Sequence, residues 1–197
     1  YNGRWAAGSS EIGFFGSLVQ NLPGGDKGSQ ADFDKARVGA PDDFTILRGG
    51  LTASHAYAND WQVRFSSSAQ WTNEPLIPGE QFGIGGVGSV RGFLEREIAN
   101  DKGFQTSLEL YTPELCKSLG DDQRCRVLAF VDTGGVYRVS PLAGEQTVEH
   151  VASAGLGWRY TWGKNLAFQT DYGHVLQGGG IRQRDDWRLH ARLGVFF

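Results

Sequence analysis

Two short segments place opposite charges among glycines and aromatic residues. Residues 82–93 read Phe-Gly-Ile-Gly-Gly-Val-Gly-Ser-Val-Arg-Gly-Phe, so Arg91 stands at the end of a glycine-rich stretch. Glycine allows a loop to turn sharply and to bring its backbone close to a neighbouring surface. Residues 130–134 read Phe-Val-Asp-Thr-Gly and supply Asp132. A guanidinium and a carboxylate recognise each other through charge-assisted hydrogen bonds, so we expect Arg91 to bind an acidic partner.

The other reactive side chains do not form a catalytic motif. The four histidines (His55, His150, His174 and His190) accompany neither a Gly-x-Ser-x-Gly nor a His-Glu-x-x-His sequence. Residues 86–89, Gly-Val-Gly-Ser, lack the following Lys-Ser/Thr of a phosphate-binding loop. We therefore expect neither enzymatic activity nor a bound cofactor.

The two cysteines, Cys116 and Cys125, flank a polar segment that is typical of a turn. A turn would bring the two side chains within bridging range, which favours a disulfide formed in an oxidising compartment. A reduced pair is the alternative. Without further Cys or His ligands the two residues would make a poor zinc site, so no metal is expected.

Composition limits the class of protein. The 29 glycines and 12% aromatic residues are typical of a β-rich chain rather than a disordered one. A net charge of −3 gives no electrostatic basis for binding nucleic acid. Because the 197 residues include no methionine, we expect a processed or truncated piece of a longer protein.

Apolar and polar residues alternate along the chain. In residues 61–72, Trp61, Val63 and Phe65 share one face and polar side chains the other, and residues 187–197 repeat the pattern. Further strands are expected at 11–20, 44–58, 104–112, 124–131, 151–162 and 166–175. The sequence thus predicts about eight strands, each close to the roughly 9–11 residues that cross a bilayer when tilted.

The connections alternate in length, which indicates a transmembrane barrel. Short turns are expected at 59–60 and 163–165, and long connections near 20–43, 73–102, 134–149 and 176–185. A soluble β-sandwich or barrel would show a similar alternation and is the alternative. A closed eight-stranded barrel is filled by its own side chains, so a conducting pore would need more strands.

These features resemble the two-partner secretion transporters of the ShlB/FhaC/HecB haemolysin secretion/activation family. The resemblance implies an all-β, antiparallel transmembrane barrel of about sixteen strands that follows periplasmic POTRA domains. Residues 1–197 would form its C-terminal half, without the POTRA domains and the N-terminal strands. It also implies a lid loop folded into the lumen.

The resemblance assigns roles to particular residues. Arg91 would pair with Asp132 and anchor the lid inside the lumen. The strand alternation places Phe130 and Asp132 on the same face as Arg126, and Glu109 on a lumen face, where an ordinary water-facing carboxylate is the favoured interpretation. The lid-loop motif comprises Phe82, Gly85, Gly86, Val90, Arg91, Gly92 and Phe93, and the lumen-wall motif comprises Phe130, Asp132 and Gly134.

The implied function is the passage of an unfolded exoprotein, such as a haemolysin or a filamentous adhesin, across the bacterial outer membrane. Expected partners are that exoprotein, outer-membrane lipid and, during biogenesis, the barrel-assembly machinery. A barrel-assembly-type insertase, which shares both motifs, is the alternative function. An outer-membrane hydrolase lacks a catalytic motif, and a plain porin would leave the two paired motifs unexplained.

Overall fold

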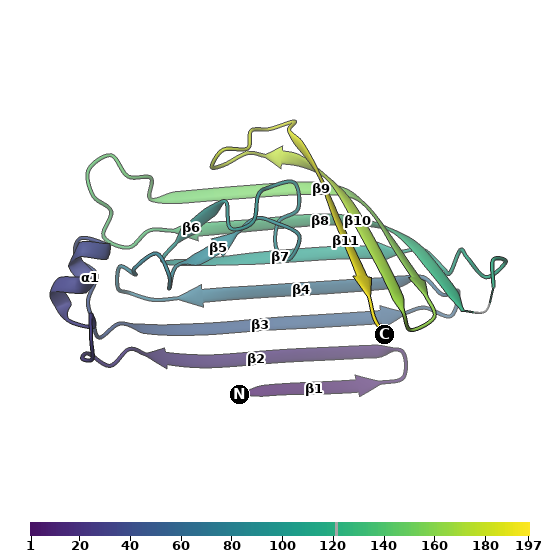
Figure 1. Ribbon diagram of the computed structural model, residues 1–197, viewed down its shortest axis with the longest axis horizontal. Coiled ribbons are helices and arrows are strands. Elements are labelled where there is room, and N and C mark those ends of the chain that lie inside the picture. The colour runs from purple at the N-terminus through teal and green to yellow at the C-terminus, as the bar shows by residue number, and fades with distance from the viewer. Residues whose placement is uncertain (121) are drawn as a thin grey trace.

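The computed structural model describes residues 1–120 and 122–197, which form one large antiparallel sheet (Figure 1). Its nine strands lie in the order β1-β2-β3-β4-β7-β8-β9-β10-β11, and β5 and β6 form a separate pair. The strands are β1 (Asn2–Ala7), β2 (Ser10–Gln20), β3 (Thr45–Ala56), β4 (Gln62–Trp71), β5 (Phe82–Ile84), β6 (Ile98–Asn100), β7 (Lys102–Tyr111), β8 (Gln123–Tyr137), β9 (Val148–Trp162), β10 (Leu166–Gln177) and β11 (Trp187–Val195). One helix, α1 (Gln30–Ala36), precedes β3.

All eight predicted strands are present, and the sheet has one more, β1. β1 was missed because it is short and has little apolar alternation; its pairing with β2, Asn2 opposite Phe15, defines it instead. The end of β8 was also placed wrongly. The strand continues to Tyr137, so Gly134 and Gly135 lie within it rather than in a loop. Ladders to both β7 and β9 hold these glycines extended and override their weak strand propensity.

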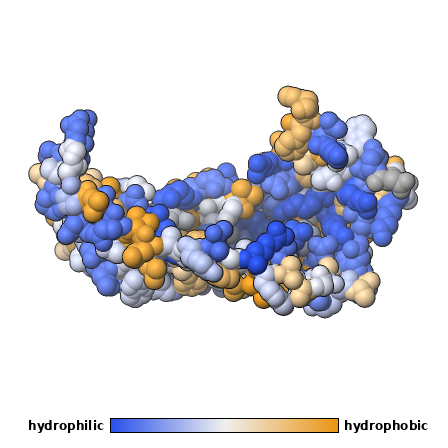
Figure 2. All heavy atoms as spheres, turned by 90° about the horizontal axis from the view of Figure 1, so that it is seen from below, coloured by the Kyte–Doolittle hydropathy of each residue, from blue (hydrophilic) through white to orange (hydrophobic). Residues whose placement is uncertain are grey.

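The two faces of the sheet differ in character. Large apolar side chains on the outer face are exposed, among them Trp5, Leu51, Trp71, Leu108, Val131, Leu156, Trp158, Leu189 and Leu193. The inner face lines a hollow that is largely hydrophilic (Figure 2). Such a division fits a sheet with hydrocarbon on one side and water on the other. Within the described part of the chain, no helix is both long and apolar enough to cross a membrane.

The ends of the strands carry different connections. Segments 21–44, 72–101, 138–147 and 178–186 emerge at one end of the sheet (Figure 1). The predicted short turns lie at the other end, together with a connection of medium length that carries Cys116. Helix α1 belongs to the first long segment, and the β5–β6 pair belongs to the second.

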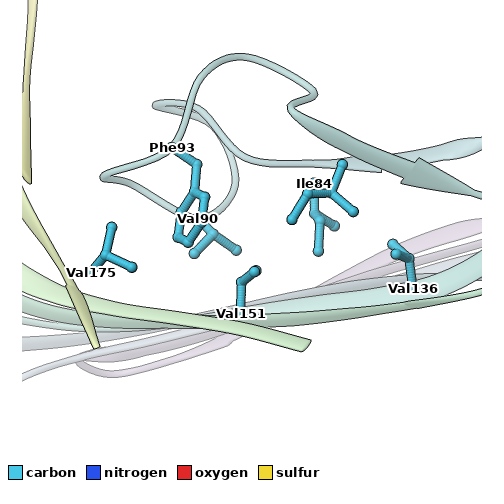
Figure 3. Packing of buried hydrophobic residues seen from close by; sticks show 7 residues of the cluster. Ile84, Val90, Phe93, Val136, Val151 and Val175 are labelled. Atoms are coloured by element: carbon cyan, nitrogen blue, oxygen red, sulfur yellow. The ribbon is translucent and has the colours of Figure 1, made fainter. Parts of the chain in front are cut away.

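A buried apolar cluster fixes the second long connection against the inner face. Ile84, Val90 and Phe93 of this connection pack on Val136, Val151 and Val175, which belong to β8, β9 and β10 (Figure 3). This contact buries apolar surface of both the connection and the wall. We call residues 82–100 the lid.

Candidate functional site

The tip of the lid is shaped by glycines and held by its apolar neighbours. Gly85, Gly86 and Gly92 have positive φ angles of 108°, 96° and 98°, a region that favours glycine. Val90 and Phe93, on either side of Arg91 and Gly92, are fully buried. The lid tip is therefore folded into the inner face, as expected, and it aims Arg91 at the wall.

Arg91 binds Asp132 through three hydrogen bonds. The guanidinium Nε and Nη2 donate to Oδ2 and Oδ1 of Asp132 at 2.7 and 2.8 Å, and the backbone N–H of Arg91 donates to Oδ2 at 3.0 Å. The exposed fractions of the two side chains are 4% and 0%. A planar guanidinium fits this bidentate geometry, which lysine cannot reproduce.

Further acidic and polar groups surround the same guanidinium. Nη1 donates to Glu109 Oε1 at 2.7 Å and to Asp171 Oδ1 at 3.4 Å, and Nη2 donates to Ser107 Oγ at 3.0 Å. Asp171 also accepts a hydrogen bond from Arg159 Nη2 at 2.8 Å. The favoured interpretation of Glu109 as an ordinary water-facing carboxylate was therefore wrong, because the lid brings a cation to it from another part of the chain.

Each residue of the wall motif contacts the lid. The Arg91 guanidinium carbon lies 3.5 Å from the centre of the buried Phe130 ring, a cation–π contact. Asp132 supplies the carboxylate. A Cβ at Gly134 would lie 3.1 Å from Ile84 Cδ1 and 3.3 Å from Val90 Cγ2, so the absence of a side chain there lets the lid approach. Phe82 packs at the edge of the buried cluster.

Sequence reasoning missed several residues that receive the lid. Gly173 on β10 lies directly beneath the tip, since a Cβ there would be 2.6 Å from the backbone nitrogen of Gly92. His190 Nε2 on β11 accepts a hydrogen bond from Gly92 N–H at 3.3 Å. Strand alternation could have placed Asp171 on the inner face, two residues before Gly173. Nothing in the local sequence, however, links Asp171 to Arg91.

The disulfide lies at the opposite end of the sheet. Cys116 and Cys125 are bonded, with their Cα atoms 5.2 Å apart, so the alternative of a reduced pair is wrong for this structure. Glu114 Oε1 accepts a hydrogen bond from the backbone N–H of Cys116 at 3.1 Å and from that of Cys125 at 2.5 Å. Because both sulfurs are bonded to each other, neither is free to ligate a metal.

An ion pair connects this turn with the one before it. Arg126 Nη2 donates to Asp60 Oδ1 at 2.8 Å, and the Glu114 N–H donates to Asp60 Oδ2 at 3.0 Å. The hydrogen bond from Arg126, helped by that from the Glu114 N–H, lowers the pKa of the Asp60 carboxyl. These contacts hold the short turns together, far from the lid tip.

Comparison with known proteins places this geometry in a family. The model of the haemolysin secretion/activation protein ShlB/FhaC/HecB matches residues 15–160. CdiB from Escherichia coli is a similar solved structure, with a TM-score of 0.78 and 20% identity over 98% of this chain and 35% of that one. CdiB from Acinetobacter baumannii has a TM-score of 0.69 and 19% identity over 98% of this chain and 32% of that one.

The search of curated proteins gave no match. The chain spans about a third of the length of the two solved structures, whose low identity supports the fold alone. The family match, by contrast, covers most of the sequence, including both the lid and the wall motif. The chain therefore belongs to the haemolysin secretion/activation protein family ShlB/FhaC/HecB, whose members are outer-membrane β-barrel transporters.

Proposed function

We propose that this chain is the C-terminal half of an outer-membrane barrel that passes an unfolded exoprotein to the cell surface, with residues 82–100 as the gate. The observation that carries the proposal is the insertion of Arg91 into the acidic site around Asp132. In this proposal, POTRA domains and the remaining strands belong to the rest of the protein. The exoprotein is of the haemolysin or filamentous-adhesin type.

The lid is suited to act as a gate because it is held by few, discrete contacts. Its tip docks through one arginine and a small apolar cluster, whereas the wall beneath is secured by continuous strand ladders. The lid can therefore leave its site without unfolding the barrel. Separating a buried ion pair is costly, so Arg91 and Asp132 distinguish sharply between a docked and an undocked lid.

The docked lid leaves part of the inner wall uncovered. A cavity of about 310 Å³ lies between Val87–Ser89 of the lid and the inner faces of β3, β4 and β7. Its wall includes Thr52, Ser66, Ser68 and Gln105. Small hydroxyl and amide groups offer hydrogen bonds to the backbone of an extended chain of any sequence, as water would. The proposed passage runs along this side of the lid.

Protein release by cells tests the proposal. A strain that lacks the complete transporter would be complemented with the wild-type gene, with Arg91→Ala, or with the control Arg4→Ala, whose ion pair with Glu11 is exposed. We expect Arg91→Ala to lower the amount of one large protein at the surface and in the medium, because a lid that cannot redock does not complete its cycle of opening and closing, while the barrel is still assembled in the outer membrane. A general fall in other outer-membrane proteins would instead favour the insertase function.

A further inference from the structure

A second buried ion pair lies at the base of the lid, away from the Arg91 site. Arg37 is the C-terminal capping residue of α1, and Asp101 directly follows β6, the returning arm of the lid. The exposed fractions of the two side chains are 11% and 0%. Sixty-four residues separate them in sequence, so the pair joins two long connections that leave the same end of the sheet.

Arg37 and Asp101 also bind the same two backbone residues. The Asp101 carboxylate accepts hydrogen bonds from the N–H groups of Leu76 and Val139 at 2.8 and 2.6 Å. Arg37 donates to the carbonyl oxygens of Leu76 and Val139 at 3.0 and 2.9 Å. Leu76 lies in the same connection as Asp101, and Val139 lies in segment 138–147, so the ion pair unites three long connections, one of which carries the lid.

The lid base is also fixed to the wall. Gln70 on β4 donates from Nε2 to the carbonyl oxygens of Glu80 and Asp101 at 2.8 and 2.9 Å, and these residues belong to the two arms leading to the lid. Arg48 on β3 holds Gln70 Oε1 at 2.7 Å and Glu80 Oε2 at 2.9 Å. Movement of the lid arms would therefore disturb Asp101 directly.

The helix-bearing connection reaches this base through one apolar cluster as well. Phe33 of α1 packs against Phe44, Ile46 and Leu76. Leu76 thus contributes its side chain to this cluster and its backbone to the ion pair. Arg37→Ala leaves this cluster in place, so the variant removes the ion pair and not the apolar contact between α1 and Leu76.

We propose that Arg37 and Asp101 form a clamp that couples segment 21–44 to the lid, so that release of one loosens the other. Arg37 is then a positioning residue of the gate, although it lies in a different connection and does not contact the lid tip. The gating role rests on the proposed function, but the coupling is a property of the structure and can be measured without any exoprotein.

Thiol labelling at two buried reporter positions tests the coupling. Ala40→Cys reports exposure of segment 21–44 and Val90→Cys reports exposure of the lid, since both residues are fully buried. Each reporter would be built into the complete transporter in outer-membrane vesicles, alone or with Arg37→Ala. Lys35→Ala is the control, because Lys35 lies on the same helix with its side chain 77% exposed.

The proposal expects Arg37→Ala to raise the labelling rate at both reporters by at least about tenfold, and Lys35→Ala to leave both rates unchanged. Because coupling is reciprocal, Arg91→Ala should raise labelling at Ala40→Cys as well. An increase at Ala40→Cys without one at Val90→Cys would overturn the proposal by showing a clamp local to the helix. Unchanged rates at both reporters would overturn it too. Asp101→Asn serves as a second variant if Arg37→Ala fails to assemble.

Discussion

Removal of the Arg91 side chain should release the lid while the sheet stays folded. Arg91→Ala deletes the hydrogen bonds from the guanidinium to Asp132, Glu109 and Ser107 and the stacking on Phe130. It also leaves Asp132, whose side chain has no exposed surface, without its cation. The nine-stranded ladder is not touched by this change.

The size of the effect follows from the burial of the pair. Breaking a buried ion pair by removing one partner costs about 3–5 kcal/mol. All of these lost contacts hold the lid against the wall, so the cost applies to lid docking rather than to strand pairing. The population of undocked lid should therefore rise by a factor of roughly 10²–10⁴.

The assay is the rate of thiol labelling at Val90→Cys, a position that is buried when the lid is docked. When opening is fast relative to labelling, the rate is proportional to the open population. Val87→Cys is the matched control, because Val87 is 42% exposed in the docked lid and should react at a similar rate with or without Arg91→Ala.

Two results would refute this reasoning. A change of less than about threefold at Val90→Cys would mean that the apolar cluster alone holds the lid. Asp132→Ala should act like Arg91→Ala, and the double variant should add little, because the residues act as one unit. Fully additive effects would contradict the pairing.

Three further predictions concern other parts of the chain. Gly173→Val should push the lid tip away from the wall and raise the labelling rate at Val90→Cys without removing a charge. The control Gly16→Ala, with no atom within 4 Å of the added Cβ, should leave that rate unchanged. Equal rates in the two variants would contradict the close approach of Gly92 to Gly173. Cys116→Ser should lower the free energy of unfolding by about 2–3 kcal/mol, seen as a lower urea midpoint in detergent, and an unmoved midpoint would contradict this. Arg126 lowers the pKa of Asp60, so the ionised carboxylate stabilises the fold above about pH 4, and this stabilisation is lost as the pH falls through the lowered pKa. Asp60→Asn should therefore show a smaller fall in melting temperature on acidification than the wild type. An identical fall in the two proteins would contradict this contribution of Asp60.

The strands could be predicted because they are two-sided. Lipid on one face and water on the other impose a period of two on every membrane-crossing strand, and residues 61–72 show it clearly. β1 and the end of β8 escaped prediction because they depend on pairing with a neighbour. Gly134 and Gly135 favour a loop locally, and only the ladders on both sides make them strand.

The central contact of the site could be predicted, but most of its surroundings could not. Arg91 and Asp132 lie in motifs with a distinctive sequence, and strand parity put Asp132 on the inner face. The contacts of Arg91 with Glu109 and Asp171 depend on where the lid docks, which no local pattern encodes. Arg37 and Asp101 lie in segments without periodicity, so nothing in the sequence connects them.

Locking the lid tests the gating proposal most directly. A Cβ at Gly134 on β8 would lie 3.3 Å from Val90 Cγ2 of the lid, so paired cysteines at positions 90 and 134 should form a reversible disulfide. The reductant can also act on the native disulfide between Cys116 and Cys125. Variants with only one of the two new cysteines, oxidised and reduced in the same way, serve as the control for this effect. The proposal predicts that exoprotein release stops when the cross-link forms and returns when it is reduced. Undiminished release with the lid fully cross-linked would contradict it.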